Sequence, residues 1–238
     1  MDNLAAYRLT AVVTAAPTGD LVDLATFKDD WDIGNTTHDA FLSRSITRCS
    51  AAISNYCNRV FGAATYQDSF RLDRAGRVGR ALDGSRNPLS LSQSPVSQIL
   101  SVTLQYSDGS SDTLVQGIDF EVNLATGQIY RLDADTGLPM DWSPVQTVVV
   151  FQAGFLLPAM DAASYPGVAS LPLDIEDAAG RMVYSRYSER SRDPYLKRIE
   201  DPRVGVKEYW IGTTPGSEGA MTPDVADILD NYRVPLVG

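Results

Sequence analysis

The sequence is poor in the residues on which most metal sites and many active sites depend. Its 238 residues include one histidine and two cysteines. A zinc site built from a Cys/His cluster is therefore excluded. The one histidine, His38, has no serine in a G-x-S-x-G setting to activate, so we expect a surface or capping role for it. No catalytic residue, metal ligand or cofactor is assigned, and an enzyme is not expected.

Long apolar runs are also missing. No stretch approaches the roughly 18 apolar residues of a membrane-spanning helix. The segment MDNLAAYRLTAVV has neither a basic leader nor a small-residue cleavage site, so no signal peptide is expected. Cys49 and Cys57 stand on one predicted helix, about 12 Å apart, which is too far for a disulfide. We expect both to be small buried apolar residues in a reducing compartment.

Positive charge is scarce and is carried almost entirely by arginine. There are 20 Lys and Arg residues against 30 Asp and Glu, which gives a formal net charge of −10. This balance argues against a protein that grips DNA phosphates over a broad surface. It is compatible with a surface that DNA passes without sticking. Arginine suits protein interfaces and carboxylate partners, although a GC-rich genome gives the same bias.

The most ordered pattern in the chain is an amphipathic run from Thr36 to Phe61. Apolar residues recur every three or four positions, which predicts one long helix with a single buried face. Thr36 is expected to cap its start, and Gly62 to take a positive φ after its end. Such a helix needs a covering surface to be stable in water. The predicted core positions are Leu42, Ile46, Cys49, Ile53 and Tyr56, with Cys57 as the alternative to Tyr56.

Two flanking segments are the candidates to cover this helix. The first begins with Asp23 as its cap and carries Leu24, Phe27 and Trp31 on one face. The second covers residues 173–192, with acidic residues in its first turn, where the helix dipole favours them. Its apolar face contains Ile175, Ala179, Met182 and Val183.

The intervening residues have the alternation of β-strands. Tyr66, Asp68, Phe70 and Leu72 face one way in a first strand. In residues 99–106, Leu100, Val102, Leu104 and Tyr106 share a face. Further strands are expected at 112–116, 118–124, 127–132 and 145–153. Turn signals separate them at Asp108-Gly109, Gln116-Gly117, Thr126-Gly127 and Thr136-Gly137. This spacing predicts a compact antiparallel sheet or a small sandwich.

The predicted fold class is therefore α+β, a small helical bundle built around one long helix and interrupted by an antiparallel β insertion. The bundle comprises residues 21–62 and 173–192, and the insertion covers residues 63–157. Residues 1–20 form an extended arm or edge strand, and residues 193–238 form an extended C-terminal arm.

The C-terminal arm ends in a short amphipathic helix on a flexible linker. Residues 213–221 have linker composition, and Thr222-Pro223-Asp224 is a strong helix start. The helix at 223–232 is too short to be stable alone. It either docks on a partner or folds back on its own bundle, and the sequence leaves both alternatives open.

Two loops carry weaker signals. Residues 73–88 form a Gly/Arg-rich segment that is either a solvated hairpin or an interface element. In the second case its arginines pair with carboxylates of a neighbouring copy or with DNA phosphates; they are Arg74, Arg77, Arg80 and Arg86. The run Asp133-Ala-Asp135-Thr-Gly137 lacks the further acidic ligands of a calcium loop, so a β-turn is expected.

The order of several motifs resembles the head–tail connector family of long-tailed bacteriophages. The motifs are DLATFKDDWDIG followed by HDAFLSRSITRCSAAISNYCNRVF; then SPVSQILSVTLQYSDG, IDFEVNLATGQIYRL and DWSPVQTVVVFQAGF; then LPLDIEDAAGRMVYSRY; and finally TPDVADILDNYRVP. Together they cover most of residues 21–235. The Gly/Arg segment 73–88 and the longer stretch 193–219 depart from the family pattern.

The resemblance implies a structural protein of the virion neck, made in the host cytoplasm and assembled as a ring, usually a dodecamer, below the portal protein. A stopper or tail protein would bind below, and DNA would pass through the channel without sequence-specific contacts. No membrane partner is expected. The alternatives are a stopper or tail terminator of the same neck, or a free-standing β-domain binding module. We expect the portal anchor to comprise Val225, Ile228, Leu229, Tyr232, Arg233, Pro235 and Leu236.

Overall fold

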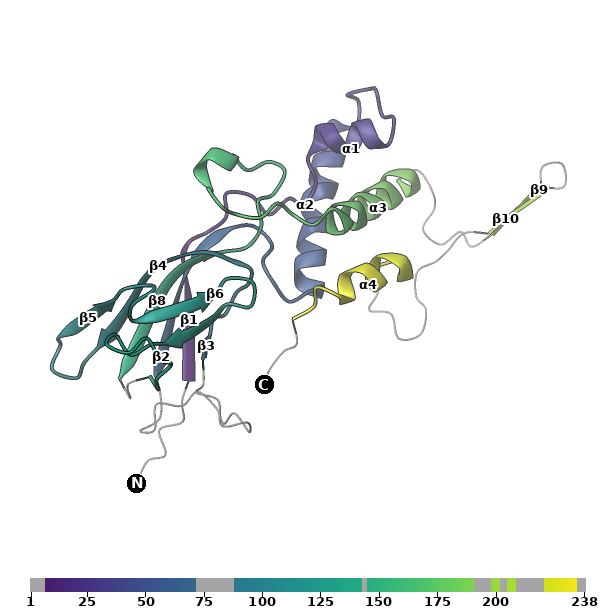
Figure 1. Cartoon of the computed structure of the whole chain (residues 1–238). Coiled ribbons are helices and arrows are strands. Elements are labelled where there is room, and N and C mark those ends of the chain that lie inside the picture. Colours follow the sequence, from purple (N-terminus) through teal and green to yellow (C-terminus); the bar gives the residue numbers. More distant parts are fainter. Residues whose placement is uncertain are drawn as a thin grey trace. The chain divides into compact units, whose positions relative to one another are not determined.

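The computed structural model describes residues 7–71, 88–142, 145–190, 198–201, 205–208 and 221–234 (Figure 1). The chain divides into two compact units. The β unit comprises residues 1–17, 62–156 and 161–170, and the helical unit comprises residues 18–61, 157–160 and 171–238. The α+β class is confirmed. None of the helices in the described ranges combines the length and the apolar character that crossing a membrane requires.

The β unit contains two antiparallel sheets. The larger sheet has the strand order β1-β2-β8-β4-β5. Its strands are β1 (Tyr7–Thr14), β2 (Ala64–Arg71), β8 (Gln146–Ala153), β4 (Val96–Gln105) and β5 (Ser111–Leu114). The smaller sheet has the order β3-β7-β6, with β3 (Leu89–Ser90), β7 (Gln128–Arg131) and β6 (Phe120–Asn123). A short 3₁₀ helix, Ala162–Ser164, also belongs to this unit.

One apolar core joins the two sheets. In β2 the buried and half-buried residues alternate as predicted, with Tyr66 and Phe70 buried. They belong to the same buried cluster as Phe151 of β8 and as Phe120 and Ile129 of the smaller sheet. Residues from both sheets therefore close on a single interior, which is the arrangement of a small sandwich.

Glycines and bulges set the register of the strands. Gly109, Gly117, Gly127 and Gly137 all have positive φ, so the four predicted turns are confirmed. The predicted face of β4 is partly wrong, however. Val102 and Leu104 are buried but Leu100 is more than half exposed, because the register shifts between Ile99 and Ser101. One extra residue in a strand moves every preceding side chain to the opposite face of the sheet.

A buried carboxylate ties the N-terminal strand into the sheet. Asp68 of β2 is fully buried and accepts hydrogen bonds from Thr10 Oγ1 at 2.7 Å, from the Ser92 backbone N–H at 2.6 Å and from Ser92 Oγ at 2.8 Å. A buried charge is tolerated where its oxygens are hydrogen-bonded in this way. Of the two N-terminal alternatives, arm or edge strand, the structure has the edge strand, because β1 pairs antiparallel with β2.

The helical unit contains α1 (Leu24–Asp30), α2 (Asp39–Tyr56), α3 (Leu173–Glu189) and α4 (Pro223–Asp230) (Figure 1). It also includes a hairpin of β9 (Arg198–Asp201) and β10 (Gly205–Glu208). Asp23 caps α1 as predicted, accepting from the backbone N–H groups of Ala25 and Thr26. With 18 residues in α2 and 17 in α3, no single long helix dominates the unit.

The ends of α2 differ from the prediction. His38, not Thr36, occupies the N-cap position. The residue with positive φ after the helix is Asn58, with φ 50°, and not Gly62. Asparagine adopts this conformation more readily than most side chains do.

The buried face of α2 is largely as predicted. Leu42, Ile46, Cys49 and Ile53 are buried, and the predicted face of α3 is buried as well. Tyr56 is wrong as a core residue because it is only half-buried. The next position, Cys57, is fully buried instead.

Candidate functional site

His38 lies in a surface cluster at the N-terminus of α2. Its Nε2 is 3.1 Å from Nη2 of Arg190, and its ring meets the edge of the Tyr187 ring at a centroid distance of 5.7 Å. The Arg190 guanidinium lies over the Tyr187 ring at 4.0 Å, a cation–π distance. The histidine therefore sits at the helix start that was predicted for it, held against the end of α3.

The aspartate pair at 133 and 135 forms a turn. Asp133 Oδ1 accepts hydrogen bonds from the backbone N–H groups of Asp135 at 3.1 Å and Thr136 at 2.9 Å. The bond from Thr136, supported by its hydroxyl, lowers the pKa of Asp133. Within the described ranges no three His, Cys, Asp or Glu side chains are grouped so that they could hold a metal ion.

The C-terminal helix α4 packs on the helices of its own unit. Val225 and Leu229 are fully buried, and α4 packs against α3. The Leu229 carbonyl accepts from Cys57 Sγ at 3.7 Å, and the backbone N–H of Val234 donates to the Cys57 carbonyl at 2.9 Å. Burial raises the pKa of the Cys57 thiol to about 11. The helix is thus fixed along its apolar face and beyond its end.

Polar contacts surround this apolar face. The Tyr56 hydroxyl donates to Asp230 Oδ1 at 2.7 Å, and Arg181 Nη1 donates to Asp224 Oδ2 at 3.3 Å. The hydrogen bond to Asp230 raises the pKa of Tyr56, because the bond is lost when the phenol ionises. The hydrogen bond from Thr222 is the main cause that lowers the pKa of Asp224. Burial opposes it, and the hydrogen bond from Arg181 lowers the pKa by a smaller amount.

Of the two alternatives for the C-terminal helix, the structure has the one in which it folds back on its own bundle. Ile228 and Tyr232 are half-buried, and Arg233 is exposed with its guanidinium 5.2 Å from the centre of the Tyr56 ring. Pro235 and Leu236 lie outside the described residues. A portal anchor made by Val225 and Leu229 therefore requires that α4 leave this position, and the anchor stays a prediction.

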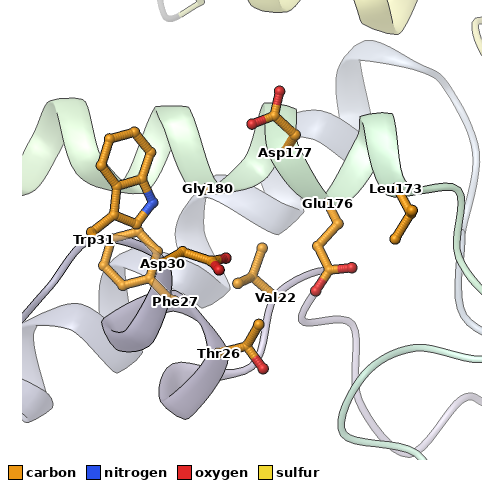
Figure 2. Close-up of a pocket in the computed structure, with 9 residues that line it drawn as sticks. All are labelled: Val22, Thr26, Phe27, Asp30, Trp31, Leu173, Glu176, Asp177 and Gly180. Atoms are coloured by element: carbon orange, nitrogen blue, oxygen red, sulfur yellow. The ribbon is translucent and has the colours of Figure 1, made fainter.

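The helical unit also has a pocket of about 510 Å³ between α1 and α3 (Figure 2). Phe27, Val22 and the Trp31 indole form its apolar part, and its charged lining residues are Asp30, Glu176 and Asp177. Burial, with a smaller contribution from Asp30, raises the pKa of Glu176. Asp177 is paired with Arg181 at 2.9 Å.

The pocket was not predicted from the sequence. Trp31 was assigned to the face of α1 that covers α2, but its ring stacks on Tyr184 of α3 with centroids 4.0 Å apart. Trp31 also lines the pocket beside Gly180, where the missing side chain leaves the α3 backbone close to the indole. The aromatic residues at α1 and on α3 could be seen in the sequence. Their spacing did not show that these two helices face each other.

The predicted arginine cluster of Arg74, Arg77, Arg80 and Arg86 lies outside the described residues. Its pairing with a neighbouring copy or with DNA remains a prediction.

No protein-family model and no curated protein matches the sequence. Solved structures of gene transfer agent (GTA) particles do match the fold. A chain in the neck of an empty GTA particle, computed with C6 symmetry, has a TM-score of 0.52 and 19% sequence identity; the match covers 97% of this chain and 98% of that one. A chain in the virion of a native particle gives 0.53, 20% identity and the same shares. The chain therefore has the fold of a protein found in phage-like particles.

Proposed function

We propose that this protein is a structural component of the neck of a phage or phage-like particle, where copies form a ring between the capsid and the tail. The observation that carries the proposal is the likeness to GTA neck and virion chains over nearly the full length of both proteins. A match of this coverage includes the β unit, the helical unit and the order in which the chain connects them. The role is structural and needs no catalytic group.

Three properties of the chain support this role. The motif order resembles head–tail connectors across residues 21–235. The formal net charge of −10 suits a channel through which DNA slides, because carboxylates do not bind phosphates. The neck chain with the same fold comes from a particle computed with C6 symmetry, and a closed ring buries the sides of each copy against the next.

Within the neck we propose the adaptor position, directly below the portal protein. The motif order favours it over a stopper or tail terminator, because the resemblance to head–tail connectors implies that the C-terminal segment TPDVADILDNYRVP binds the portal. In this arrangement α4 leaves its own bundle and inserts into the portal, with Arg233, Pro235 and Leu236 extending the anchor. A stopper or tail protein binds below, and DNA passes through without sequence-specific contacts.

The proposal is tested by the composition of purified particles. Quantitative mass spectrometry is expected to find this chain at a fixed copy number relative to the portal protein. Particles that are complete and lack the chain would refute the neck role.

The adaptor position has its own test. Truncation after Gly219 is expected to abolish co-purification with portal rings, whereas Leu138→Lys, an exposed substitution in the β unit, is expected to leave it intact. A folded truncated chain that still binds the portal would remove the anchor role and leave the neck role standing.

A further inference from the structure

The five-stranded sheet of the β unit ends in two edges that are open among the described residues. β1 and β5 are its first and last strands, and each pairs on one side only. The backbone groups on the outer side of an edge strand are a template for another strand. β1 is eight residues long and therefore spans about 27 Å at 3.4 Å per residue.

The β1 edge is apolar and weakly protected. Leu9, Val12 and Val13 are each more than half exposed. The strand contains no proline or lysine, which are common protections of natural edges. Its one charge is Arg8, whose Nη1 donates to the Ser90 carbonyl of β3 at 2.7 Å. Its one irregularity is a register shift between Val12 and Thr14 near its end. An exposed apolar edge of this kind is a candidate surface for pairing with another chain.

The opposite edge carries a second, different apolar group. Val115, directly after β5, and Ile118 in the following turn are both more than half exposed. Leu100, on the strand paired with β5, is exposed to a similar degree. The charges here are negative, Asp108 and Asp112, and are opposite in sign to Arg8 at the β1 edge. The two edges thus complement each other in charge and share apolar character.

The direction of the strands decides which kind of assembly these edges favour. Four successive antiparallel pairings separate β1 from β5, so the two strands run the same way. A ring rotation carries one copy to the next through a small fraction of a turn, which preserves that direction. Two different edges that meet head to tail make a heterologous interface, and such an interface forms a ring where the rotation between copies closes.

We infer that the β1 edge of one copy packs beside the β5 edge of the next copy of this chain, so that the two edge strands meet in parallel. The inference rests on the proposed ring and adds the surface that closes it. Leu9 and Val13 lie against Val115 and Ile118 of the adjacent copy, and Arg8 lies near that copy's acidic edge. The rival pairing joins β1 to β1 around a twofold axis, which gives an antiparallel dimer and stops there.

The test uses cysteines placed at the two edges in particles that contain the full-length chain. The native thiols interfere little, because Cys49 and Cys57 are buried and burial raises the pKa of both. The variants are Leu9→Cys, Val115→Cys and the two combined, with Leu138→Cys as a control at an exposed position outside both edge strands. Each particle preparation is treated with a short bismaleimide and separated under denaturing conditions.

The combined variant is expected to give a ladder of covalent multimers, and each single variant and the control to stay monomeric. Dimers from Leu9→Cys alone would overturn the inference in favour of the twofold pairing. Particles that contain the chain at full copy number but give no ladder would also overturn it, while leaving the neck role intact. Particles that lack the chain would refute the proposed function and this inference together.

Discussion

The Tyr232 hydroxyl lies within hydrogen-bond distance of both carboxylate oxygens of Asp174, at 2.9 and 2.8 Å, and donates its one proton to that carboxylate. The two residues lie at the end of α4 and the start of α3, so this contact fixes the last turn of the C-terminal helix. On the other side of α4, Tyr56 of α2 holds Asp230. Any role for α4 outside its own unit therefore begins with the loss of these two tyrosine–aspartate contacts.

Tyr232→Phe is expected to loosen α4 without unfolding the unit. A hydrogen bond of this kind contributes about 1 kcal/mol to stability. Hydrogen exchange of the α4 amides should therefore rise several-fold. Tyr130→Phe is the matched control, because it removes a tyrosine hydrogen bond to Gln128 in the β unit. If both variants change α4 exchange equally, the Tyr232 contact does not hold the helix.

Leu229→Ala is expected to destabilise the helical unit more than the neighbouring Ile228→Ala. Leu229 is fully buried and Ile228 is half-buried. Removal of a buried leucine side chain lowers the free energy of unfolding by about 2–5 kcal/mol, and the half-exposed position should lose much less. Denaturant unfolding of both variants measures the difference. Equal losses would show that α4 does not pack in this orientation.

Alkaline pH is expected to release α4. Burial and the hydrogen bond to Asp174 raise the pKa of Tyr232 above its usual 10.0, and the bond to Asp230 does the same for Tyr56. Because unfolded tyrosine ionises first, the stability from both contacts is complete below pH 10 and is lost as pH rises through the folded-state values. Ultraviolet titration of the phenolates, combined with proteolysis of the C-terminus, follows the release.

The matched control for the alkaline release is Tyr106→Phe. The Tyr106 hydroxyl also donates to an aspartate, Asp112, but in the β unit. The Tyr56→Phe, Tyr232→Phe double variant should remove most of the alkaline dependence of α4 release, and Tyr106→Phe should leave it unchanged. Release at the same pH in the unmodified protein and in both variants would contradict the role of Tyr56 and Tyr232.

Ile53 tests the buried face of α2. It is fully buried, whereas Val60, just beyond the helix, is half exposed. Ile53→Ala is expected to lower the free energy of unfolding by about 2–5 kcal/mol, and Ile53→Asp to prevent the helical unit from folding. Val60→Ala should change little. Thermal unfolding that is unaltered in Ile53→Asp would mean that this face is in water.

Much of the fold could be predicted because local patterns determine it. Asp23 caps α1 through its own side chain, and the glycine turns of the β unit need only the residues at the turn. The stripe from Leu42 to Ile53 follows from helical spacing alone. These features depend on neighbours in sequence, so the sequence contains the physical reason for each of them.

The errors arose where the outcome depends on distant contacts. Tyr56 and Cys57 both fit the helical spacing of the next core position. The packing of α4 decides between them, because Leu229 and Val234 both contact Cys57. The exposure of Leu100 depends on a register shift against β8. The pocket between α1 and α3 depends on which helices face each other, which periodicity does not specify.

The most direct test of the central claim is an image reconstruction of the intact neck of particles that carry this chain. We predict a ring of copies between capsid and tail, with β units in edge-to-edge contact and the C-terminal segment reaching the portal. A neck whose density is fully explained by other proteins, with no copy of this fold, would contradict it.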